Sequence, residues 1–294
     1  MNKSKVYFTK NITAENLIKI YNSLGVELKG NVGVKISTGE PGGHNFLDSK
    51  LIEPLVKKLN GTLIECCTAY GGKRQDPKDH WKTIKDHGFF SIAPCDIMDE
   101  NGEFEIPVNN GKHLTKDIVG VNLKKYNSIL MLSHFKGHAM GGFGGALKNM
   151  SIGIASSKGK INIHSAGKTL NQDECWNNLP SQDDFLESMA DACKGVIDYI
   201  GKENIVYINV ANNLSVDCDC DNNPKAPEMG DIGIFASTDP VALDQACYDA
   251  VKNSKDSGKA SLIERMDSRH AIHTVETAYY HNLGNREYEI INID

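Results

Sequence analysis

The sequence predicts an α/β fold with a mainly parallel sheet and helices on both faces. Short apolar runs typical of strands alternate along the chain with amphipathic helical segments, and this alternation is typical of parallel sheets. The runs 129–132 and 205–210 are apolar without a polar face, as expected of strands covered on both sides. The chain shows no repeat and no linker, so we expect one integrated unit over residues 1–294, with a lobe division near 165–182.

Caps and turn residues place the individual elements. Thr13 suits a helix N-cap, Asp239-Pro240 suits a helix entrance, and Ser181-x-x-Asp184 resembles a capping box. In chain order we expect a helix over 13–24, a strand over 32–36, a helix over 49–59, a strand over 62–66, a helix over 77–87, hairpin strands within 94–117, a strand over 128–133, a helix opening near 144–149, a helix over 181–200, strands over 205–210 and 232–237, helices over 239–251 and 270–281, and an edge strand over 288–293.

Composition excludes several classes of protein. The chain is 40% hydrophobic and 24% charged, which is ordinary for a globular protein. A net charge of −6 argues against a nucleic-acid partner, because such proteins carry a basic surface. No apolar run approaches the ~18 residues of a membrane span, and the N-terminus lacks a signal core. We therefore expect a cytoplasmic protein without a membrane partner; the sequence does not specify its oligomeric state.

Four glycine-bearing or polar loops directly follow predicted strands, at residues 37–45, 68–74, 133–145 and 211–223. Ligands of open α/β sheets bind beyond the carboxyl ends of the strands. We therefore expect all four loops to line one crevice.

The loop after the central strand is the richest in chemistry. Residues 133–149 contain two histidines, two lysines and five glycines. Imidazole can ligate a metal or transfer a proton, and a lysine can pair with an anion or bond covalently to a cofactor. The alternative is a tight backbone crossing with the histidines in solvent. The candidates are His138 as a catalytic residue, Lys136 for substrate, His164 for a metal, and Lys148, Gly141, Gly142, Gly144 and Gly145 for a cofactor.

The same loop also raises the prospect of anion binding. Its closing residues 144–149 predict a helix whose N-terminus faces an anion. It contains neither the phosphate-loop motif ending in Gly-Lys-Ser/Thr nor the dinucleotide fingerprint Gly-x-Gly-x-x-Gly. Phosphate binding is therefore only a secondary hypothesis.

Two other loops carry reactive side chains. Tyr70, Lys73 and Arg74 follow a strand and suit an acidic ligand group, Arg74 with bidentate geometry; the alternative is a solvated turn. Cys218 and Cys220 are separated by one residue and could ligate a soft metal or an iron–sulfur cluster with help from other ligands. A solvated turn and a redox dithiol are the alternatives for this pair.

At these motifs the chain resembles the Domain of Unknown Function 362 group, often called uncharacterised iron–sulfur centre proteins. Many relatives carry an added ferredoxin-like segment with Cys-x-x-Cys-x-x-Cys, which this chain lacks. A bacterial-ferredoxin cluster is therefore not implied. The resemblance spans nearly the whole chain and rests on residues 35–40, 68–74, 136–138, 144–149, 152–165, 218–220, 231–245 and 283–288.

A more distant resemblance is to the nickel-pincer lactate racemase family. In that family a histidine acts as acid and base, a lysine ten residues later tethers the pincer cofactor, and a histidine sixteen residues further ligates nickel. His138, Lys148 and His164 stand at this spacing. The family's second acid/base histidine is replaced here by Lys73, which would need a lowered pKa to serve as a base.

Three hypotheses follow. The leading one is an enzyme, dependent on a metal or metal-bearing cofactor, that acts on a small acidic metabolite by proton or hydride transfer. The second is a non-catalytic iron–sulfur or metal-binding protein that uses Cys218 and Cys220. The third is a module that binds a phosphate-bearing metabolite.

Overall fold

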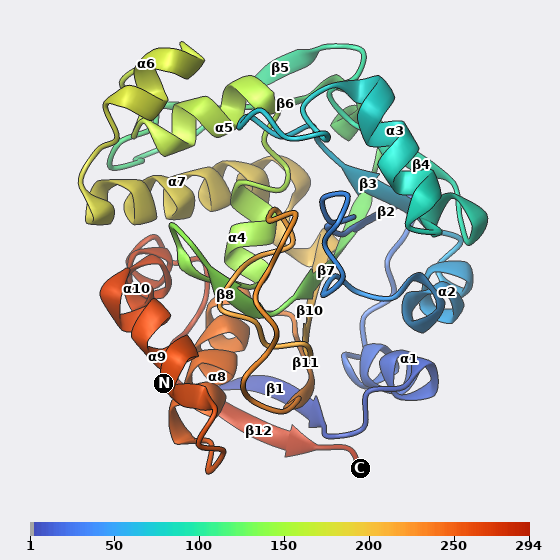
Figure 1. The fold of residues 1–294 in the computed structure, drawn as a ribbon. Coiled ribbons are helices and arrows are strands. Elements are labelled where there is room, and N and C mark those ends of the chain that lie inside the picture. The colour runs from blue at the N-terminus through green and yellow to red at the C-terminus, as the bar shows by residue number, and fades with distance from the viewer. Residues whose placement is uncertain (1–2) are drawn as a thin grey trace.

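An eight-stranded sheet forms the centre of the computed structural model, which describes residues 3–294 (Figure 1). Its strand order is β12-β1-β11-β10-β7-β2-β3-β4. Neighbouring strands are parallel except where β11 meets β1 and β10. The strands are β1 (Ser4–Thr9), β2 (Val32–Lys35), β3 (Thr62–Glu65), β4 (Cys95–Ile97), β7 (Ser128–His134), β10 (Ile205–Ala211), β11 (Gly233–Ser237) and β12 (Tyr288–Asn292).

The predicted fold class is confirmed, because helices cover both faces of this mainly parallel sheet. The helices are α1 (Ala14–Ser23), α2 (Ser49–Lys58), α3 (Pro77–Asp86), α4 (Ala146–Ser151), α5 (Ser157–His164), α6 (Gln172–Asn177), α7 (Gln182–Ile200), α8 (Pro240–Asn253), α9 (Lys259–Ser268) and α10 (Ile272–Tyr280). Thr13, Ser181 and Asp239 cap α1, α7 and α8 as expected. No helix within residues 3–294 is long and apolar enough to cross a membrane.

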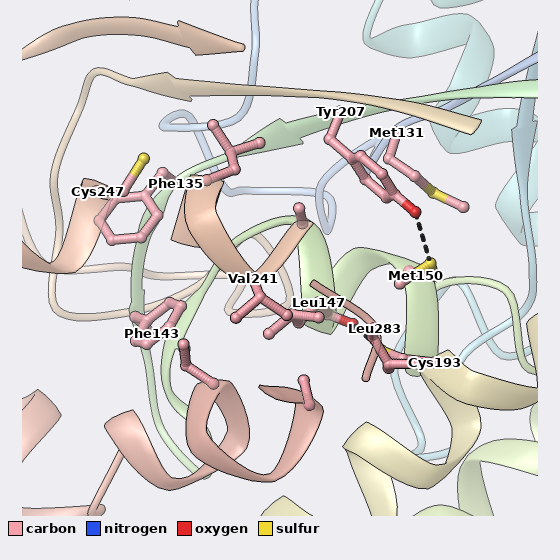
Figure 2. Close-up of a cluster of buried hydrophobic side chains, with 14 of the residues drawn as sticks. Met131, Phe135, Phe143, Leu147, Met150, Cys193, Tyr207, Val241, Cys247 and Leu283 are labelled. Carbon is pink, nitrogen blue, oxygen red and sulfur yellow. Dashed lines mark hydrogen bonds between the residues drawn. The ribbon is translucent and has the colours of Figure 1, made fainter. Parts of the chain in front are cut away.

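Strand β7 shows why the central strands are apolar on both sides. Leu130 and Leu132 pack with residues of α1 and α2 on one face, whereas Ile129 and Met131 pack with α4, α7 and α8 on the other. Figure 2 shows part of the second cluster, in which Met131 lies near Tyr207 and α4. Strands that contact helices on both faces need apolar residues at every position.

Several elements differ from the prediction. The region 94–117 does contain a hairpin, β5 (Glu103–Pro107) with β6 (Lys116–Gly120), but β4 joins the main sheet parallel to β3. Strand β1, helices α5, α6 and α9, and the hairpin of β8 (Lys136–His138) with β9 (Gly142–Gly144) were not predicted. The edge strand β12 is confirmed beside β1. The single unit with a lobe division near 165–182 stays a prediction.

The N-terminus of α4 is closed by the protein itself. The buried carboxylate of Asp244 on α8 accepts hydrogen bonds from the backbone N–H groups of Ala146, at 2.8 Å, and Leu147, at 2.9 Å. Asn209 on β10 donates a third, at 2.7 Å. Burial raises the pKa of Asp244 to about 6. The expectation that this helix N-terminus faces a ligand anion is therefore wrong, because an internal carboxylate already occupies the position.

Replacing Asp244 by alanine should destabilise the protein by about 2–4 kcal/mol, because two helix N–H groups and one amide lose a buried acceptor. Urea denaturation followed by circular dichroism measures the free energy of unfolding. The matched control is Asp173→Ala, at an exposed position, which should change stability by less than about 0.5 kcal/mol. Equal losses in the two variants would contradict this account of α4.

Candidate functional site

A cavity of about 260 Å³ lies beyond the carboxyl ends of β2, β3 and β7. Lys35, Glu65 and His134, the last residues of those strands, all line it. The four predicted loops also contribute, through residues such as Ser37, Tyr70, the 133–145 segment and Cys220. The expectation that these loops meet at one crevice is confirmed.

Helices α4 and α5 supply the remaining wall. Lys148 lies on α4, and Lys160 and His164 lie one helical turn apart on α5. The turn between the helices needs Gly153, because a Cβ there would lie 2.1 Å from the Asn149 carbonyl oxygen. This close approach brings the two helices to the same cavity.

The cavity wall carries more positive than negative charge. Its lining contains two carboxylates, Glu65 and Asp219, and five basic side chains other than histidine: Lys35, Arg74, Lys136, Lys148 and Lys160. Lys35, Glu65 and Lys160 were not singled out from the sequence. A signal for the first two was available, because each is a charged residue within an otherwise apolar strand.

Arg74 is held by partners within the protein. Its Nη1 lies 2.8 Å from Glu65 Oε1, its Nε lies 3.3 Å from Glu40 Oε1, and its Nη2 donates to the Tyr70 hydroxyl at 3.0 Å. Burial alone would raise the pKa of Glu65, but Arg74 and His80 outweigh it and bring that pKa well below its usual range. Arg74 and Tyr70 line the cavity, as predicted. Their polar groups, however, already bond to each other and to Glu40 and Glu65.

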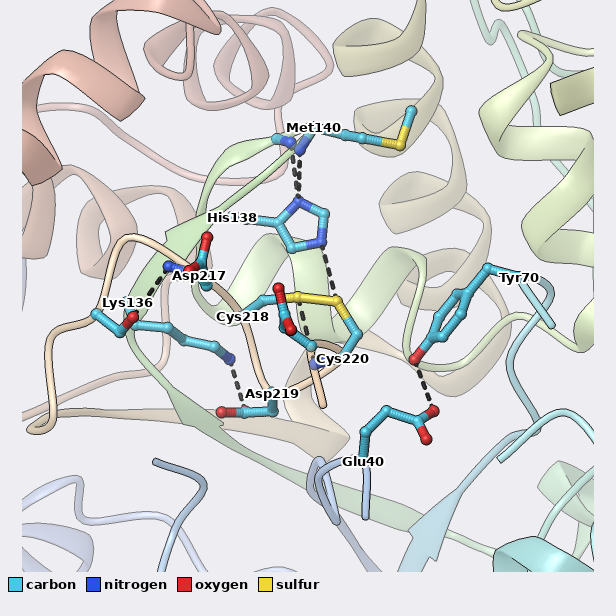
Figure 3. The surroundings of a disulfide bond; sticks show 12 residues. Glu40, Tyr70, Lys136, His138, Met140, Asp217, Cys218, Asp219 and Cys220 are labelled. Carbon is cyan, nitrogen blue, oxygen red and sulfur yellow. Dashed lines mark hydrogen bonds and ion pairs between the residues drawn. A yellow bond between two sulfur atoms is a disulfide. The ribbon is translucent and has the colours of Figure 1, made fainter. Parts of the chain in front are cut away.

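Lys136 belongs to a second internal network. Its Nζ lies 2.7 Å from Asp219 Oδ2 (Figure 3). His134 Nδ1 lies 2.8 Å from Asp219 Oδ1. Burial raises the pKa of Asp219, yet Lys136 and His134 together bring it well below the usual range. This network fixes the 211–223 loop against β7 and β8 rather than leaving Lys136 free for substrate.

The lysines without carboxylate partners are Lys35, Lys148 and Lys160. Lys35 Nζ donates to the Ile36 carbonyl and the Asn149 amide oxygen, and Lys160 Nζ donates to the Ala155 carbonyl. Lys148 Nζ has no hydrogen-bond partner within residues 3–294. Burial, and after it the charge of Lys136, lower the pKa of Lys148 to about 7. The lowered pKa gives this amine a larger uncharged, nucleophilic fraction at neutral pH than an ordinary lysine has.

His138 and His164 are held in opposite tautomers, which we assign from their partners. His138 Nδ1 accepts backbone N–H groups from Met140, at 3.2 Å, and Gly141, at 2.9 Å; the neutral ring therefore carries its proton on Nε2. His164 Nδ1 lies 2.7 Å from the Lys160 carbonyl oxygen, so it carries the proton and leaves the Nε2 lone pair free. Only His164 has the arrangement typical of a metal-bound histidine, whose second nitrogen donates to an acceptor.

Both histidines are uncharged at neutral pH. Burial, followed by the charge of Lys148, lowers the pKa of His138 well below its ordinary value. Burial lowers the pKa of His164 to about 4. A neutral imidazole fixed as an Nε2–H donor is suited to polarising a substrate oxygen. For His138 to act instead as a base, it would have to give up the two N–H groups that Nδ1 accepts.

Cys218 and Cys220 form a disulfide in the wall of the cavity. His138 Nε2 lies 4.0 Å from Cys220 Sγ (Figure 3). One donor atom from each of these three residues lies within 4.8 Å of the others, so only the reduced pair would offer two thiolates. The protonated Nε2 of His138 does not suit a third ligand. In the disulfide form, Cys218 and Cys220 therefore cannot supply the thiolate metal ligands that the sequence predicts.

Some predicted residues lie outside the cavity. The Lys73 side chain is 72% exposed and its Nζ lies 3.6 Å from Asp79 Oδ2, so it cannot supply a base from this position. Gly142 has φ +78°, and a Cβ there would lie 2.4 Å from the Ala271 Cβ. Gly141 also lies outside the cavity lining, and its backbone N–H donates to His138 Nδ1. Gly144 and Gly145 do line the cavity, and Gly145 leaves room for Asp244.

The tautomers can be measured directly. In ¹⁵N-labelled protein, long-range ¹H–¹⁵N correlation should show a protonated Nε2 for His138 and a protonated Nδ1 for His164. Neither ring should titrate between pH 5.5 and 8, because burial keeps both rings neutral over this range. His138→Gln and His164→Gln assign the signals. A protonated Nδ1 on His138 would overturn the donor role that we derive for this ring.

Lys148 should label at unusually low pH. Its rate of reductive methylation should rise with pH through about 7, because burial lowers the pKa of the amine to about 7. Peptide mass spectrometry reports labelling at each lysine. Lys168, which is 61% exposed, is the internal control for the reagent. The assignment fails if Lys148 and Lys168 show the same pH profile.

Comparisons with known proteins give a family and two structural neighbours. One neighbour is the lactate racemase apoprotein from Thermoanaerobacterium thermosaccharolyticum, with 13% identity and a TM-score of 0.47, over 86% of this chain and 58% of that one. The other is a Thermotoga maritima protein, with 13% identity and a TM-score of 0.45, over 81% of this chain and 58% of that one. The chain thus spans little more than half of either neighbour.

No curated protein matches the sequence. The family match covers most of the chain. It includes most of the central sheet, the cavity loops and the helices that carry Lys148 and His164. Residues 32–249 match the domain-of-unknown-function family DUF362, and the chain belongs to that family.

Proposed function

We propose that this protein is an enzyme that binds a small anionic metabolite in the cavity and transfers a proton or hydride with the help of a metal-bearing cofactor. The observation that carries the proposal is Lys148, a partly buried amine that lines the cavity without a hydrogen-bond partner in the described chain and whose pKa is lowered to about 7. Its neighbours in the cavity wall, Lys35 and Lys160, each donate to oxygen atoms of the protein, whereas the Lys148 amine does not. An unpartnered amine that lines a cavity is therefore available to a ligand.

The residues present fit a cofactor of this kind. The uncharged Lys148 amine can form a covalent bond to a carbonyl or acyl group. His164 presents an unprotonated Nε2, because its Nδ1 donates to the Lys160 carbonyl. A bound metal cofactor would supply a Lewis acid or an electron-accepting centre. We assign Lys148 as the tether and His164 as the metal ligand.

The same wall accounts for an anionic substrate. Lys35 and Lys160 hydrogen-bond only to uncharged oxygens, so neither forms a direct ion pair with a carboxylate in the described chain. A carboxylate or phosphate group would gain charge-assisted hydrogen bonds from them. His138 would then direct its Nε2–H at a substrate oxygen, and the buried site would strengthen that interaction by excluding water.

The decisive test uses protein purified from its native host. We expect an added mass on the peptide that contains Lys148, with about one metal ion per chain, because the amine and His164 hold the group together. Lys148→Ala should lose the adduct entirely. Lys168→Ala removes the same charge from the exposed surface and should retain both adduct and metal.

Two measurements are required for this test: intact and peptide mass spectrometry for the adduct, and elemental analysis for the metal. Native-host protein that carries neither adduct nor metal would refute the cofactor claim. A metal that persists at full occupancy in His164→Gln would refute the ligand assignment alone, because it would show that the metal binds elsewhere.

A further inference from the structure

The Cys218–Cys220 disulfide is a reactive group in the cavity that the proposed function leaves unused. It lies in the 211–223 loop between β10 and β11, and both sulfur atoms belong to residues that line the cavity (Figure 3). The other six cysteines, all within the described chain, are free thiols. Cys218 is buried, whereas Cys220 is partly exposed. A small molecule that enters the cavity therefore meets the sulfur of Cys220 first.

The disulfide is not needed to hold its loop in place. The Asp219 carbonyl accepts the backbone N–H of Glu40 at 2.8 Å, and the Asp219 carboxylate binds Lys136 and His134. Arg265 Nη1 donates to the Val216 carbonyl at 2.7 Å. A disulfide that encloses a single residue also constrains the unfolded chain least. A purely structural role therefore does not explain this bond.

Each sulfur atom has a donor that would stabilise its thiolate. Cys218 Sγ accepts the backbone N–H of Cys220 at 3.3 Å. Cys220 Sγ faces His138 Nε2 at 4.0 Å, and this nitrogen carries a proton because Nδ1 accepts two backbone N–H groups. Lys136 and Lys148 line the same cavity. Hydrogen-bond donors and positive charges favour the thiolate, which is the form that takes part in exchange.

We infer that Cys218 and Cys220 form a reversible dithiol–disulfide site that exchanges electrons with small anionic thiols. A thiolate attacks Cys220 Sγ and forms a mixed disulfide, while the electron pair of the broken bond passes to Cys218 Sγ. A second thiolate then attacks the external sulfur and releases Cys220 as a thiolate beside His138. Two thiols are oxidised to one external disulfide, and the chain gains two electrons and, from solvent, two protons.

The cavity determines which thiols can react. Its volume of about 260 Å³ admits a small molecule but not the folded surface of a protein. Lys35, Lys148 and Lys160 have no carboxylate partners, so a carboxylate-bearing thiol is attracted and a cationic thiol is repelled. The site therefore takes a low-molecular-weight thiol acid.

The test compares mercaptoacetate with 2-mercaptoethylamine on the full oxidised chain, at equal thiolate concentration. Maleimide trapping and peptide mass spectrometry measure the loss of the Cys218–Cys220 bond. A short Cys-Asp-Cys disulfide peptide gives the intrinsic ratio of the two rates. In the protein this ratio should favour mercaptoacetate by a further factor of about ten or more, because the cavity is cationic.

Cysteine variants test the order of attack. With the disulfide of mercaptoacetate, Cys218→Ser should accumulate a mixed disulfide at Cys220, whereas Cys220→Ser should react much more slowly at the buried Cys218. Cys95→Ser, which removes a free thiol outside the cavity, should leave the exchange rate unchanged. Equal trapping at Cys218 and Cys220 would show that the proposed order is wrong.

Two results would overturn the inference as a whole. One is a protein whose Cys218 and Cys220 both stay free after incubation with the disulfide of mercaptoacetate. The other is a rate ratio equal to that of the peptide. Both measurements use recombinant protein and need no metal or adduct. Their outcome is therefore separate from that of the proposed cofactor-dependent function.

Discussion

The buried carboxylate of Asp244 determines how the rest of the site is built. It joins α8 to the start of α4 and to Asn209 on β10. An ordinary helix N-terminus in this position would attract the ligand anion itself. Because Asp244 already accepts those N–H groups, the cations that face the cavity are side chains, Lys148 on α4, Lys160 on α5 and Lys35 on β2. Lys148 thus lines the cavity from a helix whose first backbone N–H groups are already hydrogen-bonded to Asp244.

The surplus of positive charge in the cavity wall lowers the stability of the folded chain wherever the two lysines with lowered pKa values would be protonated in the unfolded chain. Burial lowers the pKa of Lys148 to about 7 and that of Lys35 to about 8, whereas an unfolded lysine titrates near 10.4. Between these values the unfolded chain binds more protons than the folded chain, so stability rises as the pH increases from about 7 to about 10. A bound anion would remove this cost. The conflict between charge and burial therefore supports the proposal that the cavity binds an anion.

The fold could be predicted from the sequence largely because strands and helix caps are local. The apolar run 129–132 predicts a strand with helices on both faces, and Thr13, Ser181 and Asp239 predict helix N-termini. Helix α5 was not predicted because its sequence, with a glycine between two lysines, lacks a clear amphipathic periodicity. Strand β1 was not predicted because it is stabilised by pairing with β11 and β12, which lie far away in the sequence.

The site was only partly predictable, because charge pairing is not local. The sequence places His138, Lys148 and His164 near one another, but it cannot show that Arg74 is held by Glu40 and Glu65, or that Lys73 turns to solvent. The tautomers also depend on partners that only the folded chain supplies.

The disulfide and the cationic cavity are coupled through charge. In the oxidised form the sulfur atoms carry no charge, and Lys35, Lys148 and Lys160 face the cavity without carboxylate partners. Reduction adds up to two thiolates within the same wall, close to the Nε2–H of His138. Those thiolates would compete with a bound anion for the same positive charges and the same proton. If the cavity binds an anion, as proposed, oxidation of Cys218 and Cys220 would favour that binding, and a bound anion would in turn favour the disulfide, because the coupling between two equilibria is reciprocal.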